Sequence, residues 1–140
     1  MSTYFNSLRP GAALSSILVI GLLLTACGGG DGGDSACPGT GTVTVADGDV
    51  ALCADNLEFD ATTIEAPAGE AFNITFTNAE SQPHNVAVYT EEDGEEIAIG
   101  EIITGPDVTT QLAIDALEPG TYYFRCDVHP DMEGTIVVGG

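Results

Sequence analysis

The sequence Cys126-Asp-Val-His129-Pro-Asp-Met132 places a thiolate, an imidazole and a thioether within one short loop, here called the ligand loop. A second histidine, His84, occurs upstream in the tripeptide Pro-His-Asn, and the sequence contains only these two histidines. Thiolate and thioether ligands favour copper, and two histidines and one cysteine with a weak axial methionine form the blue-copper electron-transfer site. The sequence therefore predicts one copper ion held by His84, Cys126, His129 and Met132.

Each of these residues also has an ordinary structural role. A lone histidine on an apolar strand often only satisfies its own hydrogen bonds, a buried cysteine behaves as a small apolar residue, and a methionine fills gaps in a core. We favour a metal because both histidines and one of the two methionines fall in a single cluster. Zinc is the rival ion, but zinc sites use cysteine, histidine and carboxylates rather than methionine.

The segments around the ligand loop have the alternation of β-strands. In Thr121-Tyr-Tyr-Phe-Arg-Cys126 every second side chain shares a face. Tyr122, Phe124 and Cys126 are therefore expected in the core, with Arg125 pointing outward. After the loop, residues 134–138 form a β-branched run that is typical of a second strand.

Similar short strands, separated by turn residues, recur along the chain from residue 42. No stretch has a convincing helical period, and the segment 102–108, which contains Gly105-Pro106, is expected to be a loop. Clear examples of the strand pattern are 42–45, 71–77 and 84–89. About eight or nine short strands at this spacing predict an all-β sandwich or barrel.

The ligand loop and four upstream segments resemble the cupredoxins, the small blue-copper family that includes plastocyanin and amicyanin. The Cys-x-x-His-Pro-x-Met spacing is similar to the short ligand loop of the amicyanin type. The similarity covers roughly residues 55–138, and the upstream segments that carry it are 57–60, 64–69, 74–78 and 83–85.

This resemblance implies a Greek-key β-sandwich of about eight strands. It also implies a single copper ion bound by the four residues named above, with His129 nearest the surface as the electron port. In addition, Asn85 is implied to form hydrogen bonds near the thiolate and to tie two loops together.

The first 26 residues have the layout of a secretory signal peptide, with Arg9 before an apolar run and small residues after it. The end, Leu24-Thr-Ala-Cys27, resembles a bacterial lipoprotein cleavage box, so we expect lipid modification of Cys27. An uncleaved N-terminal anchor is the alternative, although the apolar run is shorter than the roughly 20 residues of a membrane span. The expected organisation is a signal peptide (1–26), a lipidated cysteine with a Gly-rich tether (27–41), and an extracytoplasmic cupredoxin domain (42–140).

The remaining cysteines predict a disulfide. With Cys27 assigned to lipid and Cys126 to metal, Cys37 and Cys53 remain. An exported compartment permits disulfides, and this bridge would close a loop of about 17 residues and pin the tether to the sandwich. Two free thiols are the alternative.

The charge is strongly one-sided, with 22 acidic residues against two basic ones and a formal net charge of −20. A nucleic-acid partner is excluded because phosphate binding needs a basic face. Two interpretations stay open. The acidity provides solubility or salt adaptation, or it steers a basic redox partner such as a cytochrome. Arg125 is expected to mark a locally less negative docking spot.

These features predict a monomeric, membrane-tethered one-electron carrier between redox partners outside the cytoplasm, for instance a basic cytochrome and a membrane oxidase. The sequence contains no nucleophile–base pair or carboxylate dyad that would predict an enzyme. The alternative is a copper storage or delivery protein that hands copper to an oxidase. Such proteins often use several methionines or histidines, and this chain has two of each.

Overall fold

The computed structural model describes residues 37–39 and 41–139. These residues form twelve β-strands and no helix. The predicted signal peptide, Cys27 and most of the Gly-rich tether lie outside the described residues. Across the described ranges, no helix is long and apolar enough to cross a membrane.

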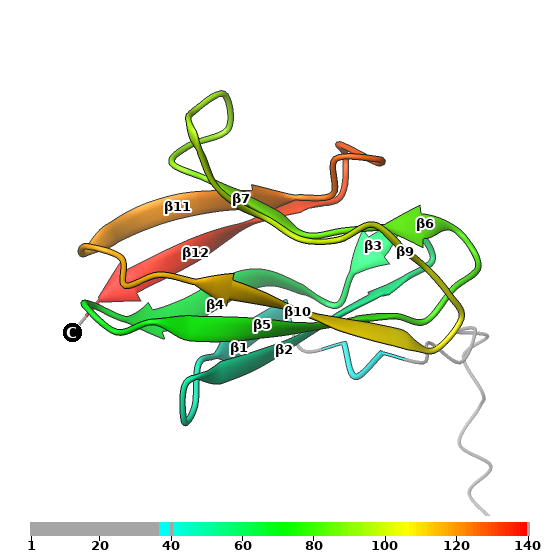
Figure 1. Ribbon diagram of the computed structural model, residues 1–140, viewed down its shortest axis with the longest axis horizontal. Coiled ribbons are helices and arrows are strands. Elements are labelled where there is room, and N and C mark those ends of the chain that lie inside the picture. The colour runs from blue at the N-terminus through cyan, green and yellow to red at the C-terminus, as the bar shows by residue number, and fades with distance from the viewer. Residues whose placement is uncertain (1–36, 40, 140) are drawn as a thin grey trace, which may run out of the picture. The chain divides into compact units, whose positions relative to one another are not determined.

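The strands form two main sheets that pack against each other (Figure 1). The larger sheet contains, in spatial order, β1 (Gly41–Thr44), β4 (Ala61–Pro67), β12 (Glu133–Gly139), β11 (Gly120–Arg125), β7 (Ala87–Tyr89) and β8 (Glu96–Ile99). The smaller sheet contains β10 (Val108–Ile114), β5 (Phe72–Asn78), β2 (Asp49–Asp55) and β3 (Glu58–Phe59). A separate ribbon pairs β6 (Pro83–His84) with β9 (Ile103–Thr104). The predicted all-β sandwich is therefore confirmed.

The chain crosses repeatedly between the two sheets, so strands that are close in sequence are often not neighbours. In the larger sheet β4 lies between β1 and β12 and runs parallel to both. In the smaller sheet β2 runs parallel to β5, and the other pairings are antiparallel. The first and last described strands therefore flank the same central strand.

The core follows from the alternation of apolar residues along the strands. In β5, Phe72, Ile74 and Phe76 are buried, whereas the residues between them are half-buried. Phe59 joins the two sheets, because its ring lies 6.1 Å from that of Phe76 in one sheet and 5.5 Å from that of Phe124 in the other. Aromatic pairs of this kind add about 0.5–1.5 kcal/mol each beyond the burial of their area.

Two expectations about the strands are wrong. The segment 84–89 is not continuous, because it divides into β6 and β7 at residues 85 and 86. The segment 102–108 is not only loop, because it contains β9, in which Ile103 pairs with His84. Both β6 and β9 have two residues, which is too short for any periodic pattern to reveal.

The side chains of β11 follow the expected alternation only in part. Phe124 is fully buried, as is Cys126 directly after the strand, whereas Tyr122 is half-buried against the edge of the core. Arg125 does not point freely outward, because its guanidinium lies 4.7 Å above the ring of Tyr89 and its Nε atom is 3.4 Å from a carboxylate oxygen of Asp127. Its positive charge is therefore paired with Asp127. That Arg125 marks a locally less negative docking spot stays a prediction.

Candidate metal centre

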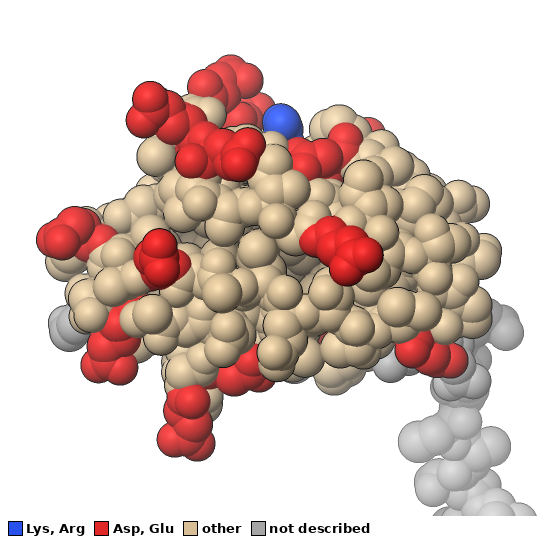
Figure 2. Space-filling view, in the orientation of Figure 1, with Lys and Arg blue, Asp and Glu red and all other residues tan. Residues whose placement is uncertain are grey.

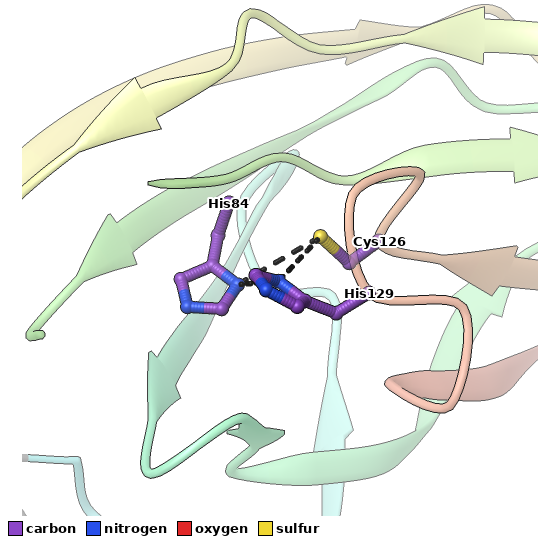
Figure 3. Close-up of side chains that lie close together, drawn as sticks. All are labelled: His84, Cys126 and His129. Carbon is purple, nitrogen blue, oxygen red and sulfur yellow. Dashed lines mark hydrogen bonds between the residues drawn. The ribbon is translucent and has the colours of Figure 1, made fainter. Parts of the chain in front are cut away.

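Three of the four predicted metal donors meet at the end of the sandwich opposite the C-terminus (Figures 1 and 3). His84 comes from β6, whereas Cys126 and His129 come from the ligand loop between β11 and β12. Cys126 Sγ lies 3.7 Å from His84 Nδ1 and 4.0 Å from His129 Nδ1. The two Nδ1 atoms are 3.2 Å apart.

The backbone of the ligand loop curls so that its ends meet. The Cys126 amide donates to the Met132 carbonyl at 2.9 Å, and the Met132 amide donates to the His129 carbonyl at 2.9 Å. These two bonds hold the backbone of Met132 next to Cys126 and His129. Met132 is only 2% exposed and belongs to the same buried cluster as Cys126.

The protonation of His84 is set by burial and by Glu80. Burial lowers the pKa of His84, although the hydrogen bond to Glu80 acts in the opposite direction, so the ring is neutral near pH 7. Its Nε2 atom lies 2.9 Å from Glu80 Oε1. A carboxylate only accepts, so Nε2 carries the proton and Nδ1 presents a lone pair to the centre.

The donor geometry fits a metal ion. Bonds of about 2.0–2.1 Å to nitrogen and 2.3 Å to sulfur would separate the donors of a trigonal site by roughly 3.5–3.8 Å. The observed separations of 3.2, 3.7 and 4.0 Å bracket this range. Lone pairs that face one another at these distances repel unless a cation or proton lies between them. Two imidazoles, a thiolate and a nearby thioether are the donor set of a type 1 copper centre.

Asn85 ties the ligand loop to the loops around β6, as the resemblance implied. Its Oδ1 atom accepts the Asp127 amide at 2.9 Å. Its Nδ2 group donates to Asp127 Oδ2 at 3.0 Å and to the Gly100 carbonyl at 3.3 Å. The structure thus places the Asn85 side chain on the residue that follows Cys126, rather than on the sulfur itself.

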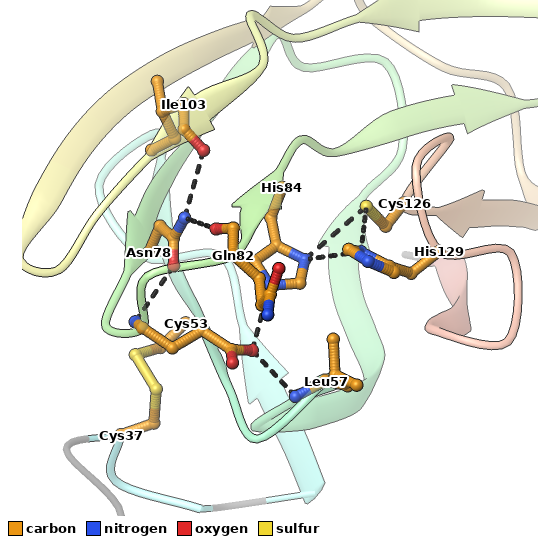
Figure 4. A network of polar contacts seen from close by, with 10 residues as sticks. Cys37, Cys53, Leu57, Asn78, Gln82, His84, Ile103, Cys126 and His129 are labelled. Atoms are coloured by element: carbon orange, nitrogen blue, oxygen red, sulfur yellow. Dashed lines mark hydrogen bonds and ion pairs between the residues drawn. A yellow bond between two sulfur atoms is a disulfide. The ribbon is translucent and has the colours of Figure 1, made fainter.

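Two supporting residues were missed by the sequence analysis, and Figure 4 shows the network to which they belong. Glu80 accepts from His84 and also from the Leu57 amide, the latter at 2.7 Å. Asn78 is fully buried and holds the loop that carries Glu80: it accepts the Glu80 amide at 3.0 Å and donates to the carbonyls of Gln82 and Ile103. The available signal was an asparagine and a glutamate just before Pro83-His84, which is too common a pattern to be assigned a role.

The same network includes the strand that carries the disulfide. Cys37 and Cys53 are bonded, as the cysteine count predicted. Cys53 is in β2, and the turn after this strand presents the Leu57 amide to Glu80. The disulfide therefore attaches the start of the described chain to β2, the strand that leads into the turn bonded to Glu80.

Comparison with known proteins agrees with this geometry. The cupredoxin-like domain family matches residues 17–138. Amicyanin from Paracoccus denitrificans is 29% identical over 96 residues, which cover 67% of this chain and 68% of that protein. Amicyanin-alpha from Methylorubrum extorquens is 33% identical over 82 residues, which cover 59% of this chain and 65% of that protein. The chain therefore spans about two thirds of the length of these two relatives.

Solved structures show the same fold. Dithionite-reduced auracyanin from Roseiflexus castenholzii matches with a TM-score of 0.58 at 22% identity, covering 69% of this chain and 100% of auracyanin. A reduced single-residue variant of amicyanin matches with a TM-score of 0.51 at 26% identity, covering 68% of this chain and 86% of amicyanin. The chain belongs to the cupredoxin-like family. It is a blue-copper protein of that family, and copper is the cofactor that its donor set defines.

Proposed function

We propose that this protein is a one-electron carrier that works outside the cytoplasm. The observation that carries the proposal is the convergence of two imidazole nitrogens and one thiolate, all within 4.0 Å of one another, on a rigid β-sandwich. His84, Cys126, His129 and Met132 are the residues that would hold the copper ion. When bound, copper supplies the one-electron couple between Cu(I) and Cu(II).

The residues of the chain keep the site similar in both oxidation states. Cys126 and His84 are fully buried, so water does not reach them. His84 is fixed by Glu80, and the ligand loop is fixed by its own backbone hydrogen bonds and by Asn85. Such outer hydrogen bonds orient metal ligands and limit rearrangement of the site.

His129 is the proposed point of electron entry and exit. Among the three converging donors, it alone is partly exposed. The neighbouring Val128 and Pro130 are exposed apolar residues. A redox partner that binds to this surface would come close to the copper without any change in the fold of this protein. Electron transfer by this route needs no substrate pocket, and we propose no catalytic residues.

We further propose that the domain is tethered to a membrane through a lipid on Cys27. The motivation is the cleavage-box sequence that ends at this cysteine. The partners would be redox proteins such as a basic cytochrome or a membrane oxidase. Mass spectrometry of protein extracted from membranes should find a lipid-modified N-terminal Cys27, and a mature protein that retains residues 1–26 would disprove the tether.

Voltammetry combined with copper retention tests the carrier function. A carrier should give a reversible one-electron wave and keep its copper through repeated cycles in the presence of a Cu(I) chelator. Rapid loss of Cu(I) to the chelator would instead indicate the alternative function, copper storage or delivery to an oxidase.

A further inference from the structure

A cluster of polar side chains at the start of the ligand loop supplies none of the four predicted copper ligands. It is centred on the carboxylate of Asp127, which directly follows Cys126. Oδ1 accepts the Tyr89 hydroxyl at 2.7 Å and lies 3.4 Å from Arg125 Nε. Oδ2 accepts the Asn85 amide group at 3.0 Å. Three donors from three different segments therefore fix one carboxylate.

The sheet explains why these groups meet. Arg125 lies opposite Ala87 on β7, and Tyr123 lies opposite Tyr89. Tyr89 and Arg125 therefore share one face as a diagonal pair of the two strands. The guanidinium stacks 4.7 Å above the Tyr89 ring, and its Nη2 atom is 3.5 Å from the Tyr89 hydroxyl. This stacking brings the Tyr89 hydroxyl and the Arg125 guanidinium to the carboxylate of Asp127.

The cluster is partly shielded from water. The side chains of Arg125 and Asp127 are 32% and 28% exposed. A carboxylate in this setting keeps more of its electrostatic influence than one in open solvent, where screening is strong. Arg125 is also the only Lys or Arg among the described residues, so the one basic side chain of this part of the protein belongs to the cluster.

We infer that the carboxylate of Asp127 tunes the copper site: Tyr89, Arg125 and Asn85 hold this negatively charged group in one position beside Cys126, and its charge favours the oxidised ion. The inference rests on the proposed copper-carrier function. A fixed negative charge stabilises Cu(II) more than Cu(I), because the oxidised ion carries one more positive charge. Tyr89 and Arg125 partly offset this negative charge. Their own effect on the reduction potential of the copper is therefore opposite in sign to that of Asp127.

This assignment predicts opposite signs for two variants. Asp127→Asn keeps the shape of the side chain and removes its charge, so it should raise the reduction potential. Tyr89→Phe removes one donor and leaves the charge less compensated, so it should lower the potential. A purely mechanical tie would behave differently, because both variants would loosen the same contact and shift the potential in the same direction.

Matched controls are available in the same region. Asp131→Asn removes an exposed carboxylate from the same loop. Tyr122→Phe removes a phenol that donates to the Glu118 carbonyl at 2.9 Å, away from the ligand loop. Neither residue belongs to the Asp127 cluster, so these variants measure the effect of losing a charge or a hydroxyl in general.

The experiment is voltammetry of the copper-loaded protein and its four variants. We expect Asp127→Asn to shift the Cu(II)/Cu(I) equilibrium at least threefold toward Cu(I), which corresponds to a rise of about 30 mV for one electron. Tyr89→Phe should lower the potential, and each control should move it by less than half the Asp127→Asn shift. Equal shifts for Asp127→Asn and Asp131→Asn, or the same sign for Asp127→Asn and Tyr89→Phe, would overturn the inference.

A second readout does not require copper. The Asp127 amide donates to Asn85 at 2.9 Å, so its hydrogen exchange reports on the cluster in the metal-free protein. Tyr89→Phe should speed this exchange by about tenfold or more, and Tyr122→Phe should leave it unchanged. Unchanged exchange in Tyr89→Phe would contradict a fixed cluster. Failure of this inference can be distinguished from failure of the proposed function. If the proteins are blue but the potentials do not shift, only the role of Asp127 is overturned. If the copper-loaded wild type is colourless, the copper function is overturned as well.

Discussion

Gly134 occupies the point where β12 passes closest to the aromatic core. A Cβ atom at this position would lie 2.6 Å from the Thr62 carbonyl oxygen and closer still to the ring of Phe124. That ring is fully buried and packs against Phe59, so it has no space to move away. The absence of a side chain here is therefore a packing requirement of the sheet.

Gly134→Ala should lower the free energy of unfolding by about 1–3 kcal/mol, the usual cost of overpacking a core. Chemical denaturation of the metal-free protein measures the change. Gly139→Ala is the control, because Gly139 is on the same strand and a Cβ there meets no atom within 4 Å. Equal stability of the two variants would show that the Phe124 contact is not tight.

Single residues also show what a sequence can and cannot predict about the site. The four donors were predictable because rare residue types, two histidines, a cysteine and a methionine, occur at a spacing with one chemical use. Glu80 was not predictable, because it is one of 22 acidic residues and only the fold brings it to His84. The contact of Arg125 with Tyr89 was missed for the same reason, since the two residues are far apart in sequence.

At the scale of elements, the loop between β5 and β6 positions His84. Its geometry depends on Asn78, the last residue of β5, whose buried amide makes three hydrogen bonds to Glu80, Gln82 and Ile103. These bonds connect β5 to the loop and to β9. The Asn78 side chain therefore makes three of the hydrogen bonds that hold this loop, which has no regular strand ladder of its own.

Asn78→Ala should destabilise the metal-free protein by about 3 kcal/mol, at about 1 kcal/mol for each hydrogen bond lost. It should also release Glu80, so hydrogen exchange of the Leu57 amide should accelerate. Asn73→Ala, on the same strand but half-buried, is the comparison and should cost much less in urea denaturation. Similar losses for both variants would contradict the supporting role of Asn78.

The elements differ in how far their sequences determine them. β5 alternates cleanly over its seven residues and was predicted within one residue of its observed bounds. The pair β6 and β9 was not predicted, because its pairing is decided by contacts between distant segments rather than by local pattern. The disulfide was predictable by elimination once the other two cysteines had been assigned to lipid and to metal as expectations.

At the scale of the whole molecule, negative charge dominates the surface. Figure 2 shows acidic side chains spread across the visible face, with very little basic surface among them. At low salt the electrostatic field of a protein with a formal net charge of −20 extends well beyond its surface. A basic redox partner would be attracted before any specific contact forms.

The second-order rate of electron transfer to a basic cytochrome should fall roughly tenfold or more between 0.1 M and 1 M salt, the low end of typical steering gains. The physical reason is screening, because the Debye length falls from about 10 Å to about 3 Å over this range. Stopped-flow measurement against salt concentration gives the profile. A flat profile would mean that the acidity serves solubility or salt adaptation, and that docking depends on apolar surface around His129.

The visible spectrum of the copper-loaded protein, compared with that of Cys126→Ala, tests the central claim most directly. The wild type should take up one copper ion per chain and show an intense thiolate-to-copper band. Cys126→Ala should lose that band, while its far-ultraviolet circular dichroism still reports a folded β-sandwich. A variant that stays blue, or a wild type that binds copper without this band, would contradict the assignment of Cys126 as the copper thiolate.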